Sequence, residues 1–264
     1  MPLTPMMQKY METKEEYKDC ILFYRLGDFY EMFFDDAKIC SKELELTLTG
    51  KSCGLEERAP MCGVPFHAVD TYLNKLVSRG YKVAICEQVE DPKQAKGLVK
   101  RAVVRIATPG TNLNTQSLDE TKNNYLMCIV YTTNAYGVSY VDVTTGEYYV
   151  TEFDSENKLL DEIFKTAPSE IICNDSFLVS GIDLEELHIR LNVVVSAGDN
   201  WHFDESKCEQ ALMEHFGVSS LDGLGLADYS IGITAAGAVM QYLTETQKTS
   251  MDHITSIKPY ITNH

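Results

Sequence analysis

The sequence lacks paired cysteines and closely spaced histidines. Its eight cysteines stand singly, none in a Cys-x-x-Cys pair, and no two of its six histidines lie three or four residues apart. These absences exclude the spacings of zinc-binding motifs and give no sign of a disulfide framework. Single cysteines within apolar stretches are typical of a reducing compartment, so we expect a cytoplasmic protein.

Long apolar runs are missing as well. The longest stretch without a charged residue, residues 123–141, contains three Asn, two Thr, one Ser and one Gly. Its alternation of polar and apolar residues is typical of strands and argues against a membrane span. The N-terminus leads into a charged helix without the apolar core of a secretory signal, so we expect no such signal.

Positive charge is scarce and unevenly distributed. The chain has 23 Lys and Arg against 39 Asp and Glu, a formal net charge of -16, and such a balance repels the phosphates of nucleic acids. Residues 1–113, however, carry 16 charges of each sign, whereas residues 114–264 carry 7 basic and 23 acidic side chains. Only the first part of the chain is therefore suited to contact a polyanion.

The length of 264 residues, with 44% apolar residues, is enough for two modest domains. In residues 1–113 the patterns predict helices near 6–18, 30–44 and 69–78, alternating with strands near 20–24, 46–49 and 81–86. This alternation predicts a small mixed-sheet α/β domain. Residues 114–124 are polar, contain no aromatic residue and predict a linker.

The second part begins with three strand-like runs at residues 125–131, 136–143 and 147–153, which predict an antiparallel meander. A helix at 156–166, a strand at 170–173 and a helix at 204–216 follow, so residues 125–228 predict a second α/β domain. The helix predicted at 229–248 is rich in Ala and Gly and has no evident partner helix. We therefore assign residues 229–264 to the start of a helical domain that continues beyond this chain.

The sequence gives little support for a nucleotide-binding loop or for a nuclease site. Residues 50–52 (GKS) end like a phosphate-binding loop, but Glu45 occupies the place of the required glycine. The meander could host a nuclease of the ribonuclease-H type, which needs clustered carboxylates for two metal ions. Its first strand has no carboxylate, Asp142 stands alone, and Glu147 and Asp154 lie toward turns. We expect no catalytic site and no metal site.

Aromatic residues are densest at residues 27–34 (GDFYEMFF), directly after a predicted strand. Helical periodicity places Phe33, and taken alone also Phe29, in the core. Against this, Phe29 follows the predicted turn immediately and lies two residues from Glu31. A turn that presents an aromatic ring beside a carboxylate is suited to probing stacked bases. Both placements of Phe29 are open at this point.

Residues 23–33 (FYRLGDFYEMF) resemble the mismatch-reading motif of MutS, a family of bacterial DNA mismatch repair proteins. The resemblance continues in order through residues 60–69 (PMCGVPFHAV), 83–88 (VAICEQ) and 104–111 (VRIATPGT). It implies a mismatch-binding domain at 1–113, a ribonuclease-H-like connector domain at 125–228 and the first helix of a helical core. In this family ATP and magnesium belong to an ATPase domain beyond these residues. The chain therefore resembles an N-terminal fragment, for which we expect no cofactor and no enzymatic activity.

By motif position, the resemblance makes Phe29 a wedge that enters the minor groove at a mispaired or unpaired base. Glu31 would be the carboxylate that hydrogen-bonds this base. Lys51 is the candidate for a backbone phosphate contact, and Met61 for an apolar contact in the groove. The residues expected to support the turn are Gly27, Asp28 and Tyr30.

The resemblance also implies two partners. Double-stranded DNA with mismatches or small insertion/deletion loops would bind the first domain, and a MutL-type protein would bind the connector domain. The acidic charge of residues 114–264 agrees with a protein partner for that part. The main hypothesis is a DNA mismatch recognition module; the alternative is a protein-interaction scaffold whose first domain is DNA-silent in isolation. The full-length family protein is a homodimer, whereas we expect this chain to be monomeric.

Overall fold

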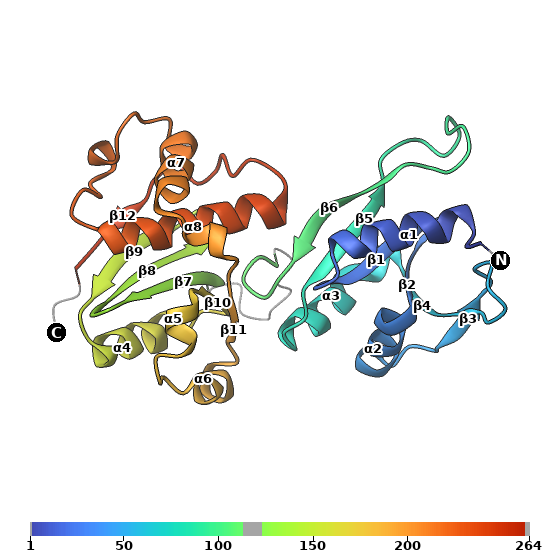
Figure 1. Ribbon diagram of the computed structural model, residues 1–264, viewed down its shortest axis with the longest axis horizontal. Coiled ribbons are helices and arrows are strands. Elements are labelled where there is room, and N and C mark those ends of the chain that lie inside the picture. Colours follow the sequence, from blue (N-terminus) through green and yellow to red (C-terminus); the bar gives the residue numbers. More distant parts are fainter. Residues whose placement is uncertain (1, 113–122, 262–264) are drawn as a thin grey trace. The chain divides into compact units, whose positions relative to one another are not determined.

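The computed structural model describes residues 2–112 and 123–261 and divides into two compact units, Met1–Thr108 and Pro109–His264 (Figure 1). Most of the linker predicted at 114–124 lies outside the described residues. Residues 109–112, which the sequence places in the first domain, pack with the second unit in the structure. The reason is a buried contact, because the Gly110 N–H donates to Glu170 Oε1 at 2.9 Å.

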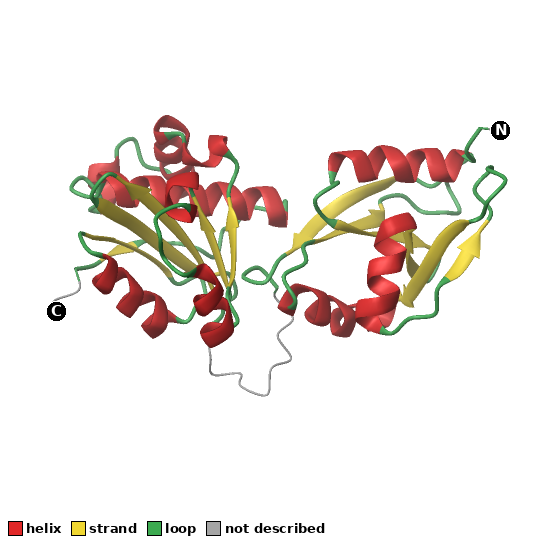
Figure 2. Ribbon diagram, turned by 60° about the horizontal axis from the view of Figure 1, so that its bottom comes forward, coloured by secondary structure: helices red, strands yellow, loops and turns green. Residues whose placement is uncertain are grey.

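The first unit is a six-stranded mixed sheet with helices on both faces (Figure 2). The strand order is β3-β4-β2-β1-β5-β6; β1 and β5 are parallel, and the other neighbours are antiparallel. This arrangement confirms the predicted mixed-sheet α/β class. The elements are α1 (Pro5–Glu16), β1 (Ile21–Leu26), β2 (Phe29–Phe33), α2 (Phe34–Leu44), β3 (Thr49–Lys51), β4 (Ala59–Pro65), the 3-10 helix η1 (Phe66–Ala68), α3 (Val69–Ser78), β5 (Val83–Gln88) and β6 (Arg101–Ala107).

Apolar side chains fill both faces of this sheet. On one face, Phe23 and Met32 pack with residues of α2 and α3; on the other, Leu22 and Tyr24 pack with residues of α1. Each face of the sheet therefore has its own apolar cluster, and β1 and β2 contribute to both. Alternation along a strand makes this possible, since successive side chains point to opposite faces.

Residues 29–33 form strand β2, although the sequence predicted a helix from about residue 30. The helix α2 begins only at Phe34. Tyr30 and Met32 are buried as alternate residues of a strand between β1 and β4, and Phe33, which began the predicted helical stripe, is buried on the opposite face. Pairing on both sides of β2 therefore overrides the local helical pattern.

The second unit is also a six-stranded mixed sheet, with strand order β11-β10-β7-β8-β9-β12. The meander β7-β8-β9 is antiparallel, and β10 and β11 run parallel to β7. This agrees with the expected ribonuclease-H-like connector fold. The elements are β7 (Tyr125–Thr132), β8 (Ala135–Asp142), β9 (Tyr148–Phe153), α4 (Glu156–Thr166), β10 (Glu170–Cys173), α5 (Asp175–Leu178), α6 (Leu184–Leu191), β11 (Val194–Ala197), η2 (Asn200–Phe203), α7 (Glu205–Phe216), η3 (Leu221–Leu224), α8 (Ser230–Gln247) and β12 (Lys258–Pro259).

Helix α8 lies within the second unit, and the assignment of residues 229–264 to a separate helical domain differs from this structure. One face of the sheet carries α4, α5 and α6, and the other carries α7 and α8 (Figures 1 and 2). Small residues allow α8 to approach closely. A Cβ atom on Gly237 would lie 2.4 Å from Cys208 Cα in α7, and one on Gly137 of β8 would lie 2.4 Å from the Ile231 carbonyl oxygen. The partner helix of α8 is α7. The sequence predicted this helix at 204–216 but not its packing against α8.

No helix among the described residues is both long enough and apolar enough to cross a membrane. Although α8 spans 18 residues and is mostly buried, its apolar side chains pack on the sheet of its own unit.

We predict that Gly237→Ala destabilises the second unit. The added methyl group would overlap the α7 backbone, and overpacking of this kind costs about 1–3 kcal/mol, more than the gain in helix propensity of about 1 kcal/mol. Gly223→Ala is the matched control, because a Cβ atom there meets open space, and its free energy of unfolding should change by less than about 0.5 kcal/mol. Urea unfolding of the 264-residue chain measures both. Equal stability of the two variants would contradict the packing of α8 on α7.

Candidate nucleic-acid interface

The turn between β1 and β2 presents Phe29 to solvent. Gly27 and Asp28 form a two-residue hairpin loop, closed by the pairing of Leu26 with Phe29. Gly27 has a φ of 61°, a left-handed conformation that glycine adopts without steric cost. Phe29 is 47% exposed. Of the two placements that the sequence left open, the structure has the exposed one.

Strand alternation separates the side chains of the motif. Phe29 and Glu31 are alternate residues of β2 and share one face, whereas Tyr30 and Met32 share the opposite, buried face. Tyr30 packs against Phe23, with ring centroids 6.1 Å apart. The motif therefore has a core side, which holds the strand, and an open side, which carries an aromatic ring and a carboxylate.

A cavity of about 360 Å³ opens beside Phe29 and Glu31. Gly63 of β4 pairs with Glu31, and a Cβ atom there would lie 3.2 Å from the Tyr30 carbonyl oxygen and 3.4 Å from Glu31 Cγ. Glycine therefore keeps the space beside the carboxylate open. Sequence reasoning missed Gly63, because its place opposite Glu31 follows from strand pairing; motif 60–69 was the available signal. The other lining residues are Leu26, Thr47, Thr49, Met61 and Cys62.

Glu31 is the only charged residue among those described as lining this cavity. Cys62 could ionise in principle, but burial, with a smaller effect of the Asp36 carboxylate, raises the pKa of its thiol to about 11. The Cys62 Sγ hydrogen is directed to the Ala37 carbonyl oxygen at 3.4 Å. Near neutral pH the cavity therefore combines apolar walls, threonine hydroxyls and one carboxylate, a composition suited to the edge of a base.

Lys51 reaches across β4 to Glu31. Its Nζ lies 3.2 Å and 3.3 Å from the two Glu31 carboxylate oxygens. The Glu31 side chain is 14% exposed and that of Lys51 35% exposed. Of the four predicted DNA contacts, Phe29, Glu31 and Met61 line one cavity, and Lys51 joins them through this ion pair.

Arg25 holds the turn that carries Phe29. Its Nε donates to the Gly27 carbonyl oxygen at 2.6 Å, and its guanidinium lies 3.1 Å from Glu87 Oε2 and 4.1 Å from the centre of the Phe66 ring. The Phe66 N–H donates to the Asp28 carbonyl oxygen at 2.9 Å. Burial raises the pKa of Glu87, while the Arg25 guanidinium opposes this shift. Both carbonyls of the loop are thus bonded, so the turn is held in place before any ligand binds.

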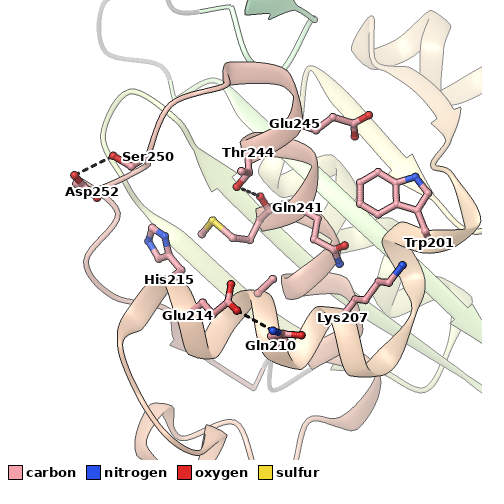
Figure 3. Close-up of a pocket in the computed structure, with 12 residues that line it drawn as sticks. Trp201, Lys207, Gln210, Glu214, His215, Gln241, Thr244, Glu245, Ser250 and Asp252 are labelled. Carbon is pink, nitrogen blue, oxygen red and sulfur yellow. Dashed lines mark hydrogen bonds between the residues drawn. The ribbon is translucent and has the colours of Figure 1, made fainter. Parts of the chain in front are cut away.

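The second unit has a larger cavity of about 660 Å³ between α7 and α8 (Figure 3). Trp201, which is 41% exposed, lies at one end, and Ser250 and Asp252 lie at the other. Helix α7 contributes Lys207 and Glu214 among others, and α8 contributes side chains that face them across the cavity. The cavity is thus a polar, partly aromatic surface feature of the acidic unit.

One end of this region holds the group Asp199, His202 and Glu245, whose potential metal-ligand atoms lie within 4.8 Å of one another. Sequence reasoning missed the group, because Glu245 comes from α8 and the other two from the segment before α7. Hydrogen bonds between these residues explain why they lie close together. The His202 Nδ1 accepts the Asp199 backbone N–H at 3.0 Å, so Nε2 carries the proton and donates to Glu245 at 2.7 Å. We assign it the role of tying η2 to α8.

The three carboxylates considered for a nuclease are each used locally. Asp142 is buried, and its oxygens accept the backbone N–H groups of Thr144, Thr145 and Asn124. The Glu147 carboxylate accepts the Tyr125 hydroxyl at 3.0 Å, and Asp154 pairs with Lys158 at 2.9 Å. They hold turns and helix ends and do not converge on one point.

Comparison with known families assigns both units. The family model described as MutS domain I matches residues 4–116, and that described as MutS domain II matches residues 124–255. The chain belongs to the MutS family. The candidate interface around Phe29 lies in domain I, and the cavity beside Trp201 lies in domain II.

Curated relatives agree along the whole chain. The DNA mismatch repair protein MutS of Lachnoclostridium phytofermentans is 64% identical over 261 residues, which are 99% of this chain and 28% of that protein. The MutS proteins of Acetivibrio thermocellus and Caldanaerobacter subterraneus are 52% and 50% identical over 98% and 100% of this chain, and 30% of each relative. The chain thus spans less than a third of the length of these MutS proteins.

We predict that Arg25→Gln lowers the stability of domain I. The variant loses the bond to the Gly27 carbonyl and leaves the carboxylate of Glu87, whose side chain is 25% exposed, without its cation. Loss of a partly buried pair of this kind should cost about 1–3 kcal/mol in the free energy of unfolding. Lys9→Gln is the control in the same unit, because the Lys9–Glu12 pair is about two-thirds exposed and should contribute less than about 1 kcal/mol. Urea unfolding compares them, and equal effects would show that Arg25 does not hold the turn.

Proposed function

We propose that this chain recognises mispaired or unpaired bases in double-stranded DNA, with Phe29 as a wedge that enters the minor groove. The observation that carries the proposal is the half-exposed Phe29 ring on a turn whose two carbonyls are both bonded. A turn whose backbone is already held loses little backbone entropy when its side chain enters a groove. Membership of the MutS family supports DNA as the ligand.

The wedge selects weakly held base pairs. Inserting an apolar side chain between base steps requires unstacking, which costs a few kcal/mol at a matched site. A mispaired or unpaired base has already lost part of its pairing and stacking, so the same insertion costs less there. The preference thus arises from the DNA as well as from the protein, and it needs no reading of the surrounding sequence.

Glu31 discriminates among the sites that the wedge can open. A carboxylate near phosphates is electrostatically unfavourable unless it gains a hydrogen bond from a base edge. Glu31 lies two residues from Phe29 on the same face of β2, so the edge of a base beside the inserted ring would meet it. Met61, in the wall of the same cavity, provides an apolar groove contact, and Lys51 binds a backbone phosphate.

This proposal gives the chain a binding function without a catalytic step. ATP hydrolysis with magnesium, and formation of a homodimer, are proposed for a complete MutS protein and involve residues beyond those of this chain. The net charge of zero in residues 1–113 implies modest affinity for DNA. We expect a dissociation constant at the non-specific level, about 10⁻⁴–10⁻⁶ M, that weakens as salt increases.

We predict that Phe29→Ala abolishes the preference for a G·T duplex over a matched duplex and leaves matched binding within about twofold. Stacking of one aromatic ring on a base contributes about 1–3 kcal/mol, and only the mismatched site admits the ring. Fluorescence anisotropy of the 264-residue chain at low salt measures both affinities. Leu55→Ala is the control, since Leu55 is also about half exposed but lies in the loop before β4. An unchanged preference in Phe29→Ala would refute the wedge.

A second function is favoured by the charge of the second unit. Residues 114–264 carry 23 acidic and 7 basic side chains, and an exposed tryptophan lines the cavity between α7 and α8. Exposed tryptophans are frequent anchors in protein interfaces. We propose this cavity and its rim as the docking surface for a MutL-type partner.

For this second function, we predict that Trp201→Ala and Glu214→Lys each weaken binding of a MutL-type protein by tenfold or more, about 1.4 kcal/mol. Glu185→Lys in α6, on the opposite face of the sheet, is the matched charge reversal and should leave binding unchanged. Surface plasmon resonance with the immobilised 264-residue chain compares the three variants. Equal losses for Glu214→Lys and Glu185→Lys would indicate general charge attraction instead of docking at this cavity.

A further inference from the structure

The ion pair between Lys51 and Glu31 joins two residues to which the proposed function gives opposite tasks. In the proposed function, Lys51 binds a phosphate and Glu31 accepts a hydrogen bond from a base. In the protein without DNA, however, their charged atoms lie 3.2 Å apart. Lys51 belongs to β3, which has three residues and lies at the edge of the sheet as described. Its side chain is 35% exposed, so the ammonium can turn outward, whereas the Glu31 side chain is 14% exposed and lies in the cavity wall.

Resting on the proposed function, we infer that Lys51 is a specificity-determining residue that is shared between Glu31 and the DNA backbone. In the free protein its ammonium compensates the Glu31 carboxylate. At a mismatched site it transfers to a phosphate, because the carboxylate there gains a hydrogen bond from a base as its new partner. The ion pair therefore couples backbone binding to the identity of the base in the cavity.

One ammonium group cannot compensate both anions. If Lys51 bridged them, the carboxylate and the phosphate oxygens would lie within about 6 Å, two hydrogen-bond lengths, and their mutual repulsion would weaken the phosphate contact. Lysine is a single point charge on a flexible stem, which suits transfer between partners. Among the described residues, the cation that pairs with the Glu31 carboxylate is Lys51.

Transfer of the Lys51 ammonium from Glu31 to a phosphate is favoured at a mismatched site and not at a matched one. At a matched site Glu31 finds no free base edge, so the Lys51 ammonium stays with the carboxylate and no phosphate contact is gained. At a mismatched site a base can donate a hydrogen bond to Glu31, and the loss of its cation is offset. Lys51 thus contributes little to binding of matched DNA while Glu31 is present, and more at a mismatch.

A double-mutant cycle on a matched duplex tests this inference. Lys51→Gln should lower the affinity of the wild-type chain by less than about twofold, but should lower that of the Glu31→Gln variant by about three- to tenfold. The reason is that Lys51 is free to contact the phosphate only when Glu31 has no charge. The cycle formed by Lys9→Gln and Glu12→Gln, an exposed pair on α1, is the control and should be additive.

Salt dependence provides a readout that a merely structural role would not change. The slope of log affinity against log salt for the matched duplex should steepen by about 0.9 in Glu31→Gln, the value of one additional phosphate contact. This increment should disappear in the Glu31→Gln, Lys51→Gln double variant and persist in Glu31→Gln, Lys51→Arg. Circular dichroism of each variant establishes that it is folded, and the slope of Glu31→Gln alone tests the inference even if the double variant does not fold.

The outcomes separate this inference from the function on which it rests. If Phe29→Ala leaves the G·T preference unchanged, the proposed wedge is wrong. If Phe29→Ala abolishes the preference but the Lys51 and Glu31 effects on matched DNA add, or the salt slope of Glu31→Gln equals that of wild type, the wedge stands and the shared ammonium is overturned.

Discussion

The pairing of β1 with β2 is the constraint on which the candidate interface depends. It begins with Leu26 opposite Phe29 and continues through the pairing of Tyr24 with Glu31. Because side chains alternate along a strand, a slip of one residue would move Phe29 and Glu31 into the core and bring Tyr30 to the open face. The two-residue loop sets this register, and the positive φ of Gly27 permits such a loop.

The open face of the motif carries a cation and a carboxylate within a few ångströms of each other. Domain I has no net charge, so its contacts with a polyanion depend on where single charges lie. Glu31 opposes phosphates, and Lys51 compensates it. In the proposed recognition, a site with this balance gains little from matched backbone contacts, so the unstacking cost of the base pair is the main energy that differs between DNA sites.

Domain II differs from domain I in two ways. Its excess of acidic side chains disfavours a general attraction to DNA, and its core depends on the close approach of α8 to α7 and to the sheet. Helix α8 is buried along most of its length because Gly237 lies against α7 and Gly137 of β8 lies against the start of α8. Buried polar contacts add to this packing, as in the bond from the Tyr242 hydroxyl to Glu170 Oε2 at 2.5 Å. The helix and the sheet thus form one unit, in which the cavity beside Trp201 lies between two helices held at a fixed distance.

The sequence by itself determined the two α/β units, the meander β7-β8-β9 and the family, because alternation, turn residues and contiguous motifs are local signals. It also located the Gly27 turn, but it could not decide whether Phe29 was core or surface, and it extended α2 back to residue 30. Only the tertiary structure decided that β2 is a strand, that Gly63 lies beside Glu31, that Lys51 pairs with Glu31 and that α8 packs on α7. Each of these depends on which distant segments become neighbours, and an apolar stripe fits a helix or a strand equally well until its partner is known.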